Sequence, residues 1–291
     1  MNAIVSTRPS FYSLVPDRER ADDLFLSYLE FLKLRNGDLF AADGFAARES
    51  LMGELTQFDA AFKGRFDNAV FNRNYVKFQD KDLSDEQLAV LAFVKMNAGE
   101  AYGVEVMSKA RAELMARPEP LYVLERVLSR EETYHTKMLV GVTSHFEGIE
   151  VEGAWRPAWP LKLLMFALAS FPPSLFHPIL VGAEISGVFT LCWLLERLGS
   201  LFPNDPGVRE SMERRIIEVL IDEVGHVAYN RICVGSAGLR AGKFLAGAVS
   251  KSHDDMTPEL NALGFAEARK RLASFDYSDL PEEVRNKAWF T

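Results

Sequence analysis

The chain has 291 residues, of which 48% are hydrophobic, and it carries a formal net charge of -8 with a pI near 5.3. A chain of this length and apolar content can bury a sizeable core, which excludes a largely disordered protein. The acidic balance argues against a nucleic-acid-binding surface, because such surfaces need clustered Lys and Arg, and it favours a small-molecule substrate.

The termini and cysteines indicate where the protein resides. Residues 1–16 lack the basic start and the continuous apolar core of a secretory signal. Cys192 and Cys233 lie in apolar helical patterns and form no Cys-x-x-Cys motif, so we expect reduced core thiols. These features predict a cytoplasmic protein.

The first third of the chain predicts helices in an all-α fold. Apolar residues recur with a spacing near 3.6, and we expect helices at about 18–34 and 46–62. The segment 64–81 is rich in Phe, Asn and Arg without a clear period, which indicates a connection packed by its aromatic residues. We interpret residues 1–83 as a helical elaboration that packs on a bundle and does not supply the site.

A long helix is predicted from Ser84 to about residue 116, with Ser84 as the N-cap and Gln87 completing a capping box. Its apolar line is interrupted by Glu100. The competing acid, Glu105, has more polar neighbours one turn away, so we favour Glu100 as the functional acid.

The next helices carry further acids on apolar faces. A helix at about 119–145 places Glu132 and His135 on the side that faces the core. A loop at 148–160 and a short apolar helix at 161–170 follow. In the helix at about 174–198, Glu184 lies on a stripe of leucines and valines, where an unpartnered carboxylate would cost several kcal/mol. We therefore expect Glu184 to be paired or metal-bound.

The region from 160 to 195 is the most apolar of the chain, but Pro172, Pro173, Pro178 and Glu184 interrupt it. It leaves no uninterrupted apolar stretch of ~20 residues, so we predict a buried bundle helix and no membrane span.

The last part of the chain begins with a helix at about 207–237, whose inward line includes Glu223 and His226. Two more helices are expected at 241–250 and 257–273, followed by a polar tail. Residues 84–237 thus form the predicted bundle core, with C-terminal helices and a tail at 238–291, all in one structural domain.

The acids and histidines form a twice-repeated pattern: a helix with one acid, then a helix with Glu-x-x-His. Positions i and i+3 share a helix face, so each Glu-x-x-His pair can bind one metal ion. Four carboxylates and two imidazoles from four helices match the di-iron or di-manganese site of a ferritin-like bundle. The predicted ligands are Glu100, Glu132, His135, Glu184, Glu223 and His226. The alternative is two buried Glu–His ion pairs in a metal-free bundle.

Neighbouring residues extend this prediction. A metal-bound histidine needs an acceptor for its second ring nitrogen, and we expect Asp222 to reach His135 and Glu131 to reach His226. For Glu131 the alternative is a solvated surface acid. The candidates for a substrate-pocket wall, which core packing would also explain, are Gly103, Val104, Tyr134, Gly187, Val188 and Val219. The remaining histidines, His145, His177 and His253, fall off the ligand pattern and are predicted to be structural or exposed.

The stretches Glu-Glu-Thr-Tyr-His-Thr (131–136) and Asp-Glu-Val-Gly-His (222–226), on a bundle with extra N-terminal helices, resemble the bacterial di-iron arylamine N-oxygenases of the ferritin-like superfamily. The likeness covers roughly residues 84–237. It implies two iron ions, or a Mn/Fe pair, that activate dioxygen and oxidise an aromatic amine. That family has a seventh ligand, a histidine one turn before the second Glu-x-x-His, where this chain has Val219.

We therefore expect a di-iron monooxygenase that oxidises a small organic substrate, with N-oxygenation of an amine as one reaction. The alternatives are a hydroxylase, desaturase or aldehyde-deformylating oxygenase on an apolar or acyl substrate, or an iron-handling ferroxidase. Electrons would come from an external reductase or chemical reductant, since no flavin or nicotinamide motif is visible. A homodimer is one option for its assembly.

Overall fold

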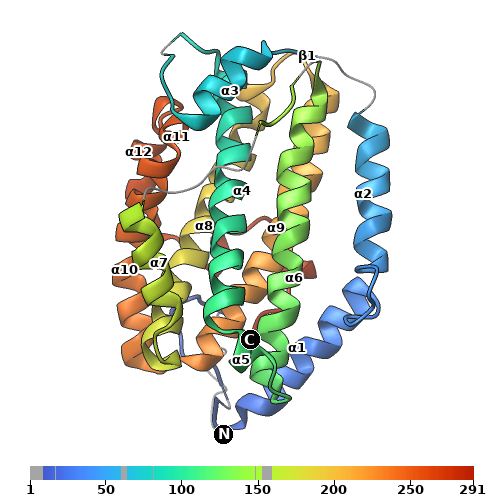
Figure 1. The fold of residues 1–291 in the computed structure, drawn as a ribbon. Coiled ribbons are helices and arrows are strands. Elements are labelled where there is room, and N and C mark those ends of the chain that lie inside the picture. The colour runs from blue at the N-terminus through green and yellow to red at the C-terminus, as the bar shows by residue number, and fades with distance from the viewer. Residues whose placement is uncertain (1–8, 17, 60–63, 81, 148, 153–158) are drawn as a thin grey trace, which may run out of the picture.

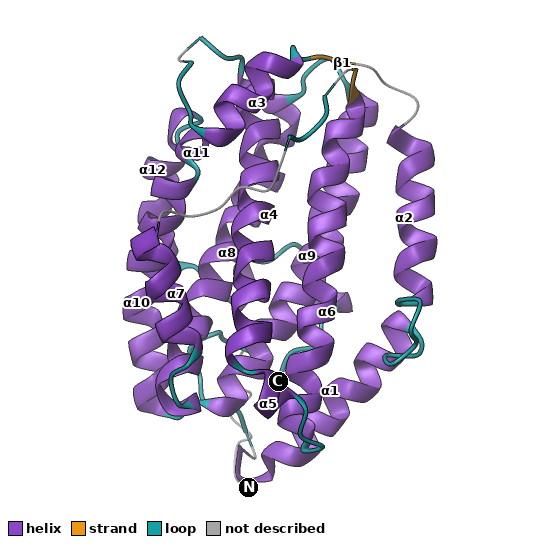
Figure 2. Cartoon of the chain, viewed as in Figure 1, coloured by secondary structure: helices purple, strands orange, loops and turns teal. Residues whose placement is uncertain are grey.

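The computed structural model describes residues 9–16, 18–59, 64–80, 82–147, 149–152 and 159–291, and the described chain is helical apart from one pair of two-residue strands (Figures 1 and 2). The α-helices are α1 (Ala21–Asn36), α2 (Ala46–Asp59), α3 (Asn68–Val76), α4 (Asp85–Ala110), α5 (Ala112–Met115), α6 (Pro120–Gly141), α7 (Trp159–Ala169), α8 (Pro173–Leu201), α9 (Pro206–Cys233), α10 (Ser236–Met256), α11 (Pro258–Ala262), α12 (Phe265–Ala268) and α13 (Glu282–Lys287). Short 3-10 segments span Arg18–Arg20, Val142–His145, Arg269–Ser274 and Tyr277–Asp279. Strands β1 (Gly64–Arg65) and β2 (Phe146–Glu147) pair in parallel, with Gly64 opposite Phe146. The all-α prediction is confirmed.

Four long helices, α4, α6, α8 and α9, surround a common interior. Helix α8 packs along α9, and α4 packs along α6, while α6 also contacts α9 and α4 contacts α8 (Figure 1). Each of the four therefore touches two others, so side chains on their facing sides meet.

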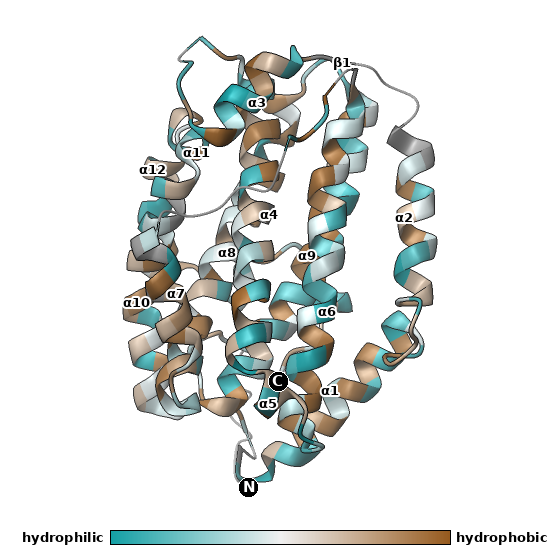
Figure 3. Ribbon diagram, in the orientation of Figure 1, coloured by the Kyte–Doolittle hydropathy of each residue, from teal (hydrophilic) through white to brown (hydrophobic). Residues whose placement is uncertain are grey.

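Local sequence sets the start of two neighbouring helices, α4 and α6. At the start of α4, the Ser84 hydroxyl accepts from the backbone N–H of Gln87, and the Gln87 side chain accepts from the N–H of Ser84. This confirms the predicted capping box. Helix α6 begins with Pro120, whose fixed φ and missing N–H suit the first helical turn. Figure 3 shows that α6 contains both hydrophobic and hydrophilic residues, as expected for a helix with one face toward solvent.

The helix predicted to run from 84 to 116 is divided in two. Helix α4 ends at Ala110, because the backbone of Arg111 (φ -116°, ψ 14°) leaves the helical region before α5 begins. The Arg111 side chain is buried and forms an ion pair with Glu125 of α6, 2.7 Å away.

In its second half, helix α9 is buried on all sides, whereas the sequence predicted burial along one inward line. Every residue from Val219 to Ile232 is buried. The reason is that α1, α2 and α13 pack on α9 in addition to α8 and α6. A helix in such a central position must place its polar groups against partners.

The prediction of a structureless connection at 64–81 is wrong for residues 68–76, which form α3. Asp67 caps this helix by accepting from the N–H of Val70 at 2.9 Å. Phe71 and Tyr75, one turn apart, stack with ring centroids 6.0 Å apart and are buried. Burial of these aromatic residues outweighs the weak helix propensity of Asn and Phe.

The C-terminal region also differs from prediction. Helix α10 is longer than 241–250, and the helix expected at 257–273 is divided at Gly264, whose φ of +94° suits glycine. The predicted polar tail contains α13, and Trp289 stacks on the buried ring of Tyr28 with centroids 4.5 Å apart. The end of the chain therefore covers α1 and α9.

Among the described residues, one helix is long and apolar enough to cross a membrane: α8, with a mean hydropathy of 1.7 over its most apolar window. Of that window, 67% is buried inside the protein. Such burial is typical of the core helix of a bundle. The absence of a membrane span stays a prediction.

Candidate metal centre

The two Glu-x-x-His pairs face each other across the interface of α6 and α9. The Nδ1 atom of His135 lies 3.1 Å from Glu132 on its own helix and 3.1 Å from Glu223 on the other. Reciprocally, Nδ1 of His226 lies 3.1 Å from Glu132 and 3.7 Å from Glu223. The centroids of the two imidazole rings are 5.7 Å apart. Each glutamate therefore lies between both histidines.

Two groups of side chains could each hold a metal ion. Glu100 of α4 joins Glu132 and His135, and a second group consists of Glu132, Glu223 and His226. Within each group the ligand atoms all lie within 4.8 Å of one another. Glu132 belongs to both groups, which is the position of a bridging carboxylate. Such a donor set, rich in hard oxygen atoms with one imidazole per ion, suits iron and manganese.

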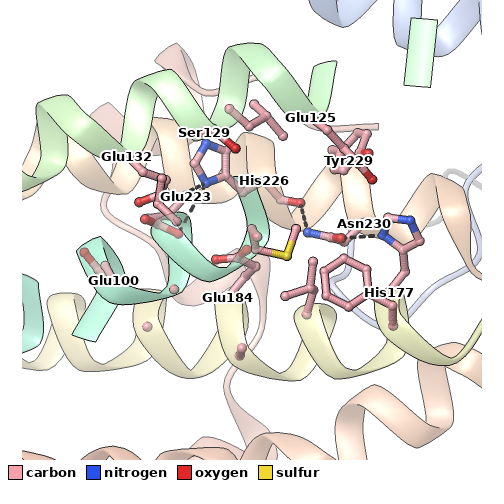
Figure 4. Close-up of a pocket in the computed structure, with 18 residues that line it drawn as sticks. Glu100, Glu125, Ser129, Glu132, His177, Glu184, Glu223, His226, Tyr229 and Asn230 are labelled. Atoms are coloured by element: carbon pink, nitrogen blue, oxygen red, sulfur yellow. Dashed lines mark hydrogen bonds and ion pairs between the residues drawn. The ribbon is translucent and has the colours of Figure 1, made fainter. Parts of the chain in front are cut away.

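Glu184 lies outside both groups but in the same cavity. It comes from α8 and lines the cavity together with Glu223 (Figure 4), and interaction with Glu223 contributes to its raised pKa. The structure thus brings the six predicted ligands to one place, with Glu184 outside both ligand groups.

The charges of this cluster favour a bound cation. Burial, reinforced by Glu223 and Glu132, raises the pKa of Glu100 well above its ordinary value. Burial and Glu223 likewise raise the pKa of Glu184. One oxygen of Glu100 is buried without a hydrogen-bond partner among the described residues. Buried carboxylates that repel one another in this way need cations, so the residues present fit a pair of divalent metal ions.

The pKa values of the two histidines are also raised, whereas those of Glu132 and Glu223, which lie between them, are lowered. Burial lowers the pKa of His135, but Glu132 and the hydrogen bond to Asp222 raise it well above its ordinary value overall. Burial raises the pKa of Glu223, but hydrogen bonds from both histidines bring it below its ordinary value. The negative charges of Glu132 and Glu223 thus favour a positive charge between them, either a proton on an imidazole or a metal ion.

The far side of each histidine is held by a second carboxylate. His135 Nε2 lies 3.1 Å from Asp222, and His226 Nε2 lies 3.4 Å from Glu131. Both contacts expected from the sequence are present. They cross between α6 and α9, so each helix orients the histidine of the other. Each Nε2 donates to a carboxylate, which leaves Nδ1 as the metal-facing nitrogen.

The N-terminal helices supply the charges that balance these carboxylates. Arg48 of α2 lies 2.5 Å from Asp222 and 3.6 Å from Glu131, and its side chain is buried. Arg35 of α1 lies 3.0 Å from Asp222. The next residue, Asn36, donates to Glu131 at 2.8 Å and accepts from Arg48 at 2.8 Å. The interpretation of residues 1–83 as separate from the site therefore needs correction for these three side chains.

The cavity beside the cluster has a volume of about 250 Å³ and is mostly apolar. Of the predicted wall residues, Gly103, Val104 and Gly187 line it. The predictions for Tyr134, Val188 and Val219 are corrected: the two valines are fully buried in the core, and the Tyr134 hydroxyl contacts α2, where it donates to Glu49 at 2.9 Å. Glu105 also lies away from the cavity and pairs with Lys109.

A polar group at the far end of the cavity was not predicted. Glu125, His177, Tyr229 and Asn230 line this end, opposite Glu100 in the close-up view (Figure 4). His177, predicted to be structural or exposed and off the ligand pattern, is fully buried and lines the cavity. Its place three to four residues before Leu180 and Val181 on an apolar face was the available signal. His145 is buried elsewhere, and the side chain of His253 lies outside the described residues.

Comparison with known proteins adds nothing to this geometry: no protein-family model, curated protein or solved structure matches the chain.

Proposed function

We propose that this protein is a non-haem di-iron oxygenase with a ferritin-like four-helix bundle, which oxidises a small organic substrate in the cytoplasm. The observation that carries the proposal is the paired arrangement of His135 and His226. Each presents Nδ1 to Glu132 and Glu223, and each donates Nε2–H to a carboxylate behind it. An ordinary buried Glu–His ion pair needs no second carboxylate to set the tautomer, whereas a metal ligand does.

The chain's own residues would hold the metal pair and keep its surroundings ordered. Glu100, Glu132 and His135 would hold one ion, and Glu132, Glu223 and His226 would hold the other, with Glu184 beside Glu223. Two ferrous ions held there would activate dioxygen, using electrons from an external reductase. Asp222 and Glu131 hold the imidazoles, and the buried Arg48 balances the charge of these outer carboxylates.

The cavity beside the cluster would receive the substrate. Its wall includes Val104, Met107, Leu128 and Leu180, so it would exclude water from the reacting position and favour an apolar molecule. This lining supports oxidation of an apolar or acyl substrate, the alternative reaction class. The resemblance around Glu131 and Asp222 supports N-oxygenation of an arylamine.

Oxygen consumption and product analysis test the proposal. Protein loaded anaerobically with ferrous iron, then given a chemical reductant and air, should consume dioxygen and convert one member of a panel containing 4-aminobenzoate, p-toluidine, p-cresol and a fatty aldehyde. The Glu132→Gln variant, which loses the carboxylate shared by both ligand groups, should not. Iron oxidation without conversion of an organic molecule, in a multi-subunit shell, would instead indicate iron storage.

A further inference from the structure

The cavity contains two buried side-chain atoms, among the described residues that line it, without a hydrogen-bond partner: Oε2 of Glu100 and Nε2 of His177. The first belongs to the candidate metal cluster. The second lies at the other end of the cavity, and His177 belongs to neither ligand group (Figure 4). A buried polar atom without a hydrogen-bond partner costs free energy of folding, unless a bound molecule supplies that partner.

The hydrogen-bond network determines what His177 offers. The side-chain nitrogen of Asn230 donates to the backbone carbonyl of His226 at 2.9 Å, which fixes the orientation of the amide. The amide oxygen therefore faces His177 Nδ1, 2.8 Å away, and can only accept. His177 must carry its proton on Nδ1, so Nε2 holds a free lone pair. Burial lowers the pKa of His177 to about 4, which keeps the ring neutral near pH 7.

The other polar groups at this end have partners: the Tyr229 hydroxyl, for example, donates to the backbone carbonyl of Leu121 at 3.4 Å. Glu125 forms an ion pair with Arg111 at 2.7 Å, so its charge is balanced. Both polar atoms of the Asn230 amide are used by His177 and His226. No lining residue in the described chain is a Lys or Arg that could bind a carboxylate. Among the described residues at this end, His177 Nε2 is thus the buried acceptor without a partner, and its surroundings are largely apolar.

We propose that His177 Nε2 accepts a hydrogen bond from a neutral, largely apolar ligand that carries one O–H or N–H donor, such as an alcohol, phenol or neutral amine. The ligand lies in the cavity with its donor at His177 and its opposite end toward Glu100 and Glu184. Carboxylate-bearing molecules are disfavoured, because a negative group would meet either the carboxylate cluster or an unpaired lone pair. His177 is a positioning residue for the ligand and not a metal ligand.

This assignment deepens the proposed function and rests on it in one respect, namely that the ligand is the substrate. With its donor held at His177, the ligand turns its remote end to the metal cluster. Oxidation at carbon is then expected, rather than at the donor atom. The binding of the ligand itself requires only the cavity.

Two isosteric probes test the proposal in the full-length protein as purified. The probes are p-cresol and p-xylene, which differ by a hydroxyl in place of a methyl group, and calorimetric titration gives their dissociation constants. The variants are His177→Asn, whose amide nitrogen can replace Nδ1 but which has no atom at Nε2, and His177→Gln, whose amide oxygen can replace the Nε2 acceptor.

The proposal predicts that His177→Asn weakens p-cresol binding by about three- to tenfold, the loss of one buried hydrogen bond, and changes p-xylene binding by less than about twofold. His177→Gln should restore most of the p-cresol affinity. Equal losses for both probes, an unchanged p-cresol affinity in His177→Asn, or failure of p-cresol to bind the unmutated protein would overturn the proposal.

Nitrogen NMR keeps the test decisive if His177→Asn does not fold. In the unmutated protein labelled with ¹⁵N-histidine, p-cresol should shift the resonance of an unprotonated Nε2 that is missing from His177→Gln, and p-xylene should not. Identical shifts with both probes contradict the proposal. Iron content is measured on the same samples: a protein that discriminates the probes but binds no iron would refute the proposed function and leave the His177 assignment intact.

Discussion

Asp222 accepts a hydrogen bond from His135 across the α6–α9 interface, with 3.1 Å between its carboxylate oxygen and Nε2 of the ring. The same carboxylate lies 2.5 Å from Arg48 of α2. One side chain thus joins the candidate metal centre to the N-terminal helices, and it is where metal affinity and fold stability become linked.

The first prediction concerns Asp222 as the orienting partner of His135. Asp222→Asn should lower the affinity for ferrous iron by about 10- to 100-fold, because it removes the anion that fixes the tautomer and raises the basicity of the imidazole. Competition with a chelator measures this affinity. Glu196→Gln, which removes an exposed partner of Arg271, is the control and should leave it unchanged. Equal affinities for both variants would contradict the role given to Asp222.

The second prediction concerns the buried Arg48. Arg48→Gln should lower the free energy of unfolding by about 3 to 5 kcal/mol, since it leaves Asp222 and Glu131 without their main countercharge in the interior. Urea denaturation measures the change. The matched control is Arg214→Gln, because Arg214 pairs with Glu54 at the surface, where such a pair contributes about 0 to 1 kcal/mol. A loss below about 1 kcal/mol for Arg48→Gln would show that the N-terminal helices do not balance the site.

The third prediction uses two glycines of α8. A Cβ atom at Gly187 would meet nothing within 4 Å, so Gly187→Leu should fit into the cavity and reduce ligand binding while iron content stays the same. At Gly182 a Cβ would lie 2.8 Å from the backbone carbonyl of Gly242 on α10. Gly182→Ala should therefore lower the melting temperature, as measured by circular dichroism. If Gly187→Leu were destabilised and Gly182→Ala were not, the packing described for these two positions of α8 would be contradicted.

The fourth prediction is a pH dependence from His177. Burial lowers its pKa from 6.5 to about 4, the hydrogen bond to Asn230 partly opposes this, and Arg111 lowers it further. Between these two values the unfolded chain binds a proton at this residue and the folded chain does not. Stability therefore falls as the pH drops from about 6.5 to 4, by up to about 3 kcal/mol from this residue.

The measurement for this prediction is the difference in unfolding free energy between the unmutated protein and His177→Gln at several pH values. Taking this difference cancels the contribution to the pH dependence of the carboxylates that both proteins share. The variant should lose less stability than the unmutated protein between pH 6.5 and 4. Parallel curves would contradict a neutral, buried His177.

The meeting of the two Glu-x-x-His pairs in one cluster could be predicted from the sequence, because the spacing rules that apply are local. Spacing of three residues brings Glu132 and His135 to one helix face, and the same holds for Glu223 and His226. Tyr134 illustrates the limit of such reasoning: two residues after Glu132 it lies about 200° around the helix, so it contacts α2 and not the cavity.

The direction of the cavity could not be predicted from single helices. It extends from Glu223 toward Tyr229 on α9 and from Glu184 back toward His177 on α8. Val219 precedes the cavity-lining part of α9, and Val188 follows the cavity-lining part of α8, so both valines pack in the core. Arg48 was missed for a different reason: it is 174 residues from Asp222 in sequence, and only the packing of α2 on α9 brings the two together.

The central claim is that these side chains bind a pair of iron ions, and Mössbauer spectroscopy with elemental analysis tests it most directly. Protein expressed with ⁵⁷Fe should contain two irons per chain whose spectra show magnetic coupling in the oxidised state. The Glu223→Ala variant, checked by circular dichroism for folding, should lose the coupled pair. Unmutated protein that is folded but contains no coupled iron pair, and no manganese–iron pair by elemental analysis, would contradict the account.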